Sequence, residues 1–167
     1  MMLLSRGLVA LFLLAGTALC APVEGNSISA ADPLAARDTI VTCVPKKNDS
    51  PTKSFKVSVD NGKSQAQVAG FSTGKSGYPH LFENKEGLKW GVRECDEANV
   101  ALEEYPLFWS GAKQSEWKKD VKKSDQDKTP IRVIYANKSG AVVYCGIVVH
   151  GTVAADYSGS DAFVKCG

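Results

Sequence analysis

The stretch IRVIYANKSGAVVYCGIVVH, residues 131–150, decides the fold. Its two apolar runs, residues 131–135 and 141–149, are rich in β-branched and aromatic side chains, as strands are. The turn-forming residues 137–140 lie between them, with Asn first and Gly last, and predict a tight hairpin turn. The stretch therefore predicts two antiparallel strands of one sheet.

Further strands are expected on both sides of this hairpin. Residues 39–44 and 54–59 alternate in polarity around a run of Asn, Asp, Ser and Pro, so they predict an N-terminal hairpin. Residues 100–108 and 162–165 predict two more strands. Because proline cannot donate to a sheet ladder, Pro106 predicts a bulge or a sheet edge within the first of them.

One helix is expected, over residues 64–68, with Gly70 as its stop signal. Short strands, tight turns and a single small helix are typical of the α+β class. We therefore predict one short helix packed on a twisted antiparallel β-sheet, with an N-terminal β-hairpin.

The strand pattern also predicts which side chains share a surface. Successive side chains of a strand point to opposite faces of the sheet. Glu104, Arg132 and His150 fall on three different expected strands. One sheet surface can therefore hold a carboxylate, a guanidinium and an imidazole together.

The first 20 residues have the pattern of a secretory signal peptide. Arg6 supplies the positive charge, residues 7–16 are apolar, and small residues suited to cleavage follow. The apolar run is too short for a comfortable membrane span. Residues 21–37, rich in Ala, Ser, Pro and Gly, are expected to form a propeptide or flexible tail. Residues 38–167 would then be a single secreted domain with no stable membrane association.

Four of the five cysteines lie in the expected mature domain: Cys43, Cys95, Cys145 and Cys166. An even number of cysteines in a secreted chain implies two disulfides, and their spacing alone does not choose among the three pairings. No two of these cysteines are close in sequence and none has a histidine beside it, so a zinc site is not favoured and no metal is expected.

The formal net charge of +2 argues against a large, non-specific nucleic-acid-binding protein. Lysines gather between residues 113 and 128, but acidic residues are interspersed among them. Both a solvated loop and a phosphate-binding patch are consistent with this pattern.

The two histidines of the chain lie in distinctive segments, His80 in Tyr78-Pro79-His80 and His150 at the end of Cys145-Gly146-Ile147-Val148-Val149-His150. The unperturbed pKa of imidazole lies near neutrality, which suits proton transfer. Taken singly, each is more often an ordinary surface or core histidine.

Together with three other motifs, these segments resemble the secreted fungal guanyl-specific ribonucleases and the related sarcin-like ribotoxins. The resemblance spans residues 39–167 and depends on five motifs in order: Tyr78-Pro79-His80, Glu104-Tyr105-Pro106, residues 132–135, residues 145–150 and residues 163–166. It implies a secreted, monomeric endoribonuclease that forms 2′,3′-cyclic phosphates and then hydrolyses them. It also implies single-stranded or ribosomal RNA as partner, a preference for guanosine, and no metal or other cofactor.

The resemblance assigns catalytic roles motif by motif. Glu104 would be the general base and His150 the general acid. Arg132 would bind the phosphate with its planar fork of donors, Tyr78 would hydrogen-bond the same phosphate, and His80 would assist the base. Because the nucleophile is the 2′-hydroxyl of the substrate, no activated serine is needed and DNA would not be cleaved.

In the same family, the segment after the first histidine binds the base, and Glu86 is the residue here that would accept from the N–H edge of guanine. Two positions depart from the family pattern. Lys85 replaces the aromatic residue that stacks on the base, which leaves Phe82 as the platform, and Asp161 replaces an asparagine. The full set of expected substrate-binding residues is Phe82, Glu83, Asn84, Lys85, Glu86, Asp161 and Phe163.

Several features resemble the ribotoxins more closely, and they imply the disulfide pairing Cys43–Cys166 and Cys95–Cys145. Residues 84–104, however, form a shorter loop than the basic loop that directs those toxins to the sarcin–ricin loop of the ribosome. Three functions therefore stay open. A general endoribonuclease is favoured; a ribotoxin that blocks translation, with the ribosome as partner, is the nearest alternative. A non-catalytic ribonuclease-like effector that binds host RNA or protein is the third, and the retained catalytic residue types argue against it.

Overall fold

A computed structural model of the protein describes residues 38–167. The expected signal peptide, residues 1–20, and the expected propeptide or tail, residues 21–37, lie outside the described residues. Within the described part, no helix is long and apolar enough to cross a membrane.

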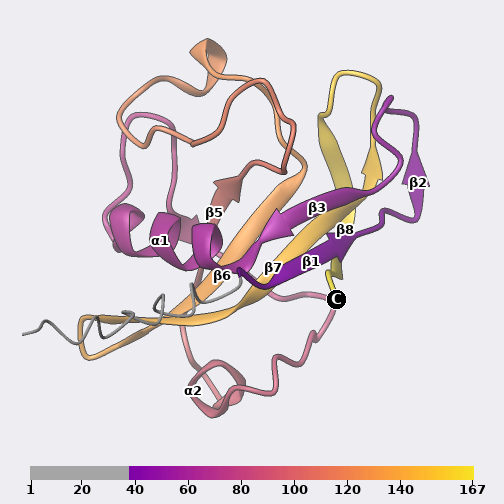
Figure 1. The fold of residues 1–167 in the computed structure, drawn as a ribbon. Coiled ribbons are helices and arrows are strands. Elements are labelled where there is room, and N and C mark those ends of the chain that lie inside the picture. Colours follow the sequence, from indigo (N-terminus) through magenta and orange to yellow (C-terminus); the bar gives the residue numbers. More distant parts are fainter. Residues whose placement is uncertain (1–37) are drawn as a thin grey trace, which may run out of the picture. The chain divides into compact units, whose positions relative to one another are not determined.

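The main sheet has six strands, and every pairing in it is antiparallel except that of β2 with β7. Its strands are β2 (Lys47–Asn48), β4 (His80–Leu81), β5 (Leu102–Leu107), β6 (Ile131–Lys138), β7 (Ala141–Val153) and β8 (Gly159–Lys165). The β6–β7 hairpin expected from residues 131–150 is confirmed, and β5 and β8 flank it. Figure 1 shows these strands with α1 lying across one side of the sheet.

The N-terminal hairpin is also confirmed, as β1 (Ile40–Cys43) paired with β3 (Phe55–Ser58). The helix prediction for residues 64–68 was too short, because α1 spans Val59–Ala69. Ser58 caps it by accepting a hydrogen bond from the backbone N–H of Asn61 at 2.9 Å. The apolar alternation that runs to Val59 hid this start, since it favours a strand.

The first turns of α1 contain Gly62, a poor helix former that weakened the sequence signal. Packing compensates: a Cβ at this glycine would lie 3.3 Å from Ile147 and 3.5 Å from Leu107, so the helix approaches the sheet closely there. Four short elements were not predicted: the two-residue strands β2 and β4, the helix α2 (Arg93–Asp96) and the 3-10 turn η1 (Lys123–Asp125).

The two faces of the sheet have separate cores. The face under α1 is filled by buried side chains such as Tyr105, Val133 and Val149. The opposite face carries a smaller cluster: Phe82, Trp90, Cys95, Leu102, Ile134, Ala136, Cys145 and Val148. Leu102, Ile134 and Val148 alternate with residues of the first core, as the strand pattern predicts. The expected catalytic residues on these strands therefore lie on the face away from α1.

The structure contains the disulfides Cys43–Cys166 and Cys95–Cys145, which is the pairing that the ribotoxin resemblance implies. The first joins β1 to the C-terminal end of the chain across 123 residues, and the second joins α2 to β7 across 50 residues. Bridges that close long loops restrict the unfolded chain most. Each is expected to stabilise the domain by roughly 2–5 kcal/mol.

Pro106 lies where β5 has a partner on one side only. It pairs with Arg132 of β6, whereas the two-residue strand β4 pairs only with Glu103 and Glu104. The sheet-edge prediction for Pro106 is confirmed and the bulge alternative is wrong, because β5 pairs with β6 in unbroken register from Leu102 to Leu107. The missing N–H of proline therefore interrupts no ladder.

Candidate active site

Glu104 is a buried carboxylate at the centre of the site, with only 6% of the residue exposed. The register of β4 and β5 places His80 directly beside it, with His80 Nε2 3.1 Å from Glu104 Oε1. Glu104 Oε2 is buried and has no hydrogen-bond partner among the described residues. Burial raises the pKa of Glu104, and the charges of Arg132 and His80 partly oppose this rise. One oxygen of a carboxylate with raised basicity is thus free to accept a proton.

Arg132 is also buried, with 7% exposed, and its guanidinium is fixed by three hydrogen bonds. Nη1 donates to the carbonyl oxygens of Thr129 at 2.9 Å and Ile131 at 2.8 Å, while Nη2 donates to the Tyr78 hydroxyl at 3.1 Å. Nε has no partner among the described residues. Because a guanidinium has five N–H donors, the edge formed by Nε and Nη2 retains two of them for an anion. This edge suits bidentate binding of a phosphate.

His150 lies on β7, two positions beyond the residue that pairs with Arg132, and so on the same face. Its ring packs on Phe163 of β8, with centroids 4.1 Å apart, and its Nδ1 is 3.3 Å from the carbonyl oxygen of Asp161. Burial and the charge of Arg132 lower the pKa of His150 to about 4. The imidazole is therefore held in place, and its lowered pKa keeps it neutral near pH 7 in the free enzyme. A negatively charged ligand beside it would favour protonation.

Gly159 was not found from the sequence, yet it shapes the site. A Cβ at this position would lie 2.3 Å from Cδ2 of His150, so only glycine lets the ring lie against the β8 backbone. The sequence signal was limited to a Ser-Gly pair, which is common in turns.

Tyr78 links the other groups. Its ring stacks on His80, with centroids 4.6 Å apart and planes 27° from parallel, and its hydroxyl accepts from Arg132. The structure thus joins Glu104, His80, Tyr78 and Arg132 by direct contacts. These residues come from three strands and the segment before β4, which explains why no single motif contains the site.

A cavity of about 670 Å³ opens beside Glu104 and His80. All seven expected substrate-binding residues line it: Phe82, Glu83, Asn84, Lys85, Glu86, Asp161 and Phe163. The loop after β4 and the strand β8 therefore come together around a space large enough for a small ligand.

The seven residues differ in how they meet this cavity. Phe82 is buried between Phe163 and Trp90, with ring centroids 5.5 Å and 6.0 Å away, so it packs beneath the cavity rather than offering an open stacking surface. Asn84 accepts from the backbone N–H of Leu88 at 2.8 Å and donates to its carbonyl oxygen at 3.0 Å, which closes the loop.

The charged residues of the cavity lining are more open. Glu83 and Lys85 form an exposed ion pair that lowers the pKa of Glu83. Glu86 Oε1 accepts from the backbone N–H of Phe163 at 3.1 Å, which connects the loop after β4 to β8. Asp161 contributes its backbone, with φ of 63° and its carbonyl oxygen near His150.

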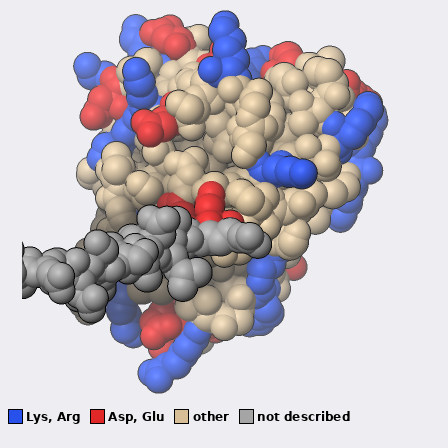
Figure 2. Space-filling model, in the orientation of Figure 1, with Lys and Arg blue, Asp and Glu red and all other residues tan. Residues whose placement is uncertain are grey.

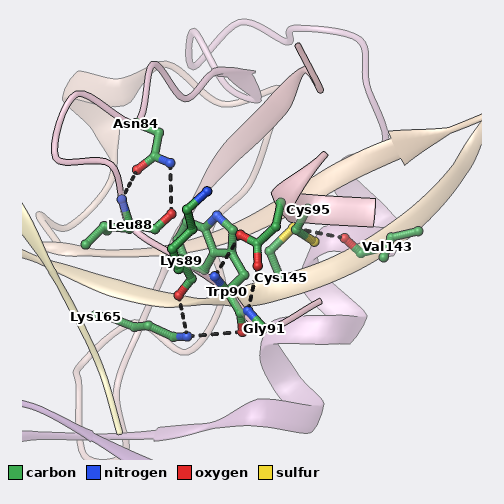
Figure 3. Close-up of a disulfide and its surroundings, with 10 residues drawn as sticks. Asn84, Leu88, Lys89, Trp90, Gly91, Cys95, Val143, Cys145 and Lys165 are labelled. Carbon is green, nitrogen blue, oxygen red and sulfur yellow. Dashed lines mark hydrogen bonds between the residues drawn. A yellow bond between two sulfur atoms is a disulfide. The ribbon is translucent and has the colours of Figure 1, made fainter. Parts of the chain in front are cut away.

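The loop after β4 is anchored at its far end, as Figure 3 shows. Lys165 Nζ donates to the carbonyl oxygens of Lys89 at 2.9 Å and Trp90 at 3.2 Å. Asp96 accepts from the backbone N–H groups of Trp90 and Gly91, close to the Cys95–Cys145 bridge. Sequence reasoning missed these anchors, because a lysine and an aspartate that bind backbone leave no motif.

The charged side chains are spread unevenly over the surface but do not form a single basic patch. On the face that Figure 2 shows, basic side chains gather along the right edge, basic and acidic side chains mix at the top and bottom, and uncharged residues cover most of the surface between them. Among residues 38–167, no cluster of three or more His, Cys, Asp or Glu side chains is arranged to hold a metal ion.

The chain is similar to known proteins over almost the whole described part. A family model described as ribonuclease matches residues 44–167. Ribonuclease clavin of Aspergillus clavatus is 32% identical over 174 aligned positions, which cover 87% of this chain and 90% of clavin. Ribonuclease mitogillin of Aspergillus fumigatus is 33% identical and covers 84% of this chain and 89% of its own length.

Solved structures agree with this similarity. Hirsutellin A of Hirsutella thompsonii is 46% identical, with a TM-score of 0.65, and the match covers 77% of this chain and 98% of hirsutellin A. Restrictocin, an Aspergillus protein described as a highly specific ribotoxin, is 25% identical, with a TM-score of 0.59, and the match covers 77% of this chain and 99% of restrictocin.

Proposed function

The chain belongs to the ribonuclease family and is an endoribonuclease, and we propose that it cleaves RNA by transphosphorylation at the Glu104–Arg132–His150 cluster. One observation carries this proposal. Glu104 Oε2 and Arg132 Nε are both buried without hydrogen-bond partners among the described residues. Leaving such groups unsatisfied costs about 1–3 kcal/mol each, and a bound phosphodiester with its 2′-hydroxyl supplies the missing acceptor and donor.

The proton transfers balance across two residues. Glu104 takes the proton of the substrate 2′-hydroxyl, whose oxygen attacks the adjacent phosphorus and forms the 2′,3′-cyclic phosphate. The bond from phosphorus to the 5′-oxygen breaks, and His150 gives that oxygen a proton. Hydrolysis of the cyclic phosphate runs the same transfers in reverse, with water in place of the leaving group.

The fixed donors support the transition state. Arg132 meets the phosphoryl oxygens with its free edge, and Tyr78 adds its hydroxyl. His80 contacts Glu104 directly and holds its carboxylate in one orientation. The negative charge of bound RNA offsets the effect of Arg132 on His150, so the pKa of His150 rises toward the range in which an acid is effective.

The loop cavity is proposed to bind guanine, with the Glu86 carboxylate accepting from the N–H edge of the base. Adenine presents no pair of N–H donors in that arrangement, so the Glu86 carboxylate would gain no such pair of hydrogen bonds from it. The Phe163 N–H that now binds Glu86 fixes the carboxylate in the cavity before the base arrives.

Action on ribosomal RNA is a second candidate, favoured by the similarity to restrictocin, which is described as a highly specific ribotoxin. We further propose that the enzyme is secreted and acts as a monomer.

The test is cleavage of total RNA and of intact ribosomes by the wild-type enzyme, with His150→Gln as control. General degradation supports an unrestricted ribonuclease, and one discrete ribosomal RNA fragment supports the ribotoxin. No cleavage by the wild-type enzyme would overturn both and leave a binding protein.

A further inference from the structure

A second cavity, of about 290 Å³, lies on the other side of the catalytic cluster. Its lining includes Tyr78, Lys123, Lys128, Gly159 and Arg132. It shares no lining residue with the cavity beside Glu104 and His80 that is proposed to bind guanine, which we call the base cavity. The residues expected to bind and cleave the phosphodiester therefore lie between two cavities. The proposed function assigns a ligand to only one of them.

The division of catalytic residues between the two cavities gives the direction of the RNA strand. Glu104 and His80 line the base cavity, whereas Arg132 and Tyr78 line the second cavity. Glu104, as the general base, must reach the 2′-hydroxyl of the nucleotide whose guanine is recognised. That nucleotide therefore occupies the base cavity. The strand that continues past the phosphate then enters the second cavity.

The position of His150 agrees with this direction. Its ring lies between Phe163, which lines the base cavity, and Gly159, which lines the second cavity. An acid placed at this boundary can reach the 5′-oxygen that joins the scissile phosphate to the next nucleoside. The second cavity thus lies next to the leaving group rather than the nucleophile.

Lys123 provides an unpaired positive charge at this cavity, which the carboxylate of Asp127 also lines. Its Nζ lies 5.9 Å from the centre of the Tyr78 ring, and it forms no ion pair within residues 38–167. Lys128, in contrast, is paired with Asp156. An exposed, unpaired ammonium at the rim suits an RNA phosphate, which a lysine binds as a point charge.

We propose that the second cavity binds the nucleoside on the leaving side of the scissile bond and that Lys123 binds the 3′-phosphate of that nucleoside. This inference rests on the proposed function. Lys123 becomes a substrate-binding residue that distinguishes an internal bond of an RNA strand from the last bond before a free 3′-hydroxyl end.

The test compares three substrates that share the same scissile phosphate: the methyl ester of guanosine 3′-phosphate, the dinucleoside GpA, and GpA with an added 3′-phosphate. For the wild-type enzyme, kcat/KM should rise along this series. The added phosphate should contribute about two- to fivefold, the range of one exposed ion pair, and this contribution should shrink at high salt.

Lys123→Ala should abolish the gain from the 3′-phosphate, and Ser158→Phe, which fills the cavity from its lining, should abolish the gain of GpA over the methyl ester. Lys122→Ala is the matched control, because this exposed neighbour does not line the cavity. Equal kcat/KM for all three substrates would overturn the inference, as would an equal loss in the Lys122 and Lys123 variants. Cleavage of total RNA or ribosomes but of none of the three substrates would also overturn the inference, whereas no cleavage of any RNA would mean that the proposed function itself fails.

Discussion

The proposed catalytic residues and most of the proposed base-binding residues are held by different kinds of structure. Glu104, Arg132 and His150 belong to three adjacent strands whose pairing fixes their positions. Glu83, Lys85 and Glu86 belong to a loop and are exposed. Strand register leaves little freedom, whereas a loop tolerates substitution. The chemistry of the enzyme is therefore held more rigidly than its choice of base.

The two regions also differ in solvation. The strand cluster is buried enough to raise the pKa of Glu104 and lower that of His150. In the loop, Glu83 and Lys85 form an exposed ion pair, which solvent screens. Changes to the strands should thus act on the rate of the chemical step, and changes to the loop on binding and selectivity.

The largest effect is expected for the acid. His150→Gln should lower kcat about 10²–10⁴-fold on any RNA, because glutamine fits the space but cannot donate a proton to the leaving oxygen. The melting temperature should stay close to that of the wild type. Near-normal kcat in this variant would remove the acid assignment.

Glu104→Gln should be somewhat less severe, with a loss of about 10²-fold in kcat. His80 lies 3.1 Å from the carboxylate and can serve as a weaker base when Glu104 is replaced. The double variant Glu104→Gln, His80→Gln should then lose further activity. If the double variant is no slower than the single one, His80 has no part in proton transfer.

The pH dependence of the free enzyme follows from the same burial. The base needs Glu104 ionised, which requires a pH above its raised pKa, and the acid needs His150 protonated, which requires a pH below about 4. The product of the two fractions is largest in the acid range and falls about tenfold per pH unit outside it. The profile of kcat/KM on a dinucleotide should therefore peak below neutrality, and a peak at pH 8 would contradict these assignments.

A substitution at Gly159 of β8 tests how strongly this strand fixes the position of the His150 ring. Gly159→Ala should reduce kcat by about tenfold, because the added methyl group pushes the His150 ring out of position, and a displacement of about 1 Å can cost up to 100-fold. Ser160→Ala is the control, since it adds no atom next to the ring. Equal activity of both variants would show that the ring tolerates the shift.

The strand half of the site was largely predictable from the sequence, and the loop half was not. Two-residue alternation showed that Glu104, Arg132 and His150 can share one face, because side-chain direction in a strand follows from position, and the strand register places them there. The family motifs identified Glu86 and Phe163, but nothing in the sequence indicated the hydrogen bond between them. Gly159 and Lys123 gained their significance only from residues distant in sequence, which local patterns do not report.

An effect no larger than that of Gly159→Ala is expected in the loop, and it tests the division between the two regions. Glu86→Gln should lower kcat/KM on a guanosine dinucleotide by about tenfold, the cost of about 1.4 kcal/mol for replacing a charged acceptor with a neutral one. The kcat/KM for cleavage after adenosine should change little, so the ratio of kcat/KM for guanosine to that for adenosine falls. Glu116→Gln, an exposed glutamate that lines neither cavity, is the matched control. If Glu86→Gln instead lowers kcat equally on all substrates, Glu86 acts on the chemical step. Its hydrogen bond from the Phe163 N–H would then position His150, whose ring packs on Phe163. In that case the choice of nucleobase and the chemical step are not separable.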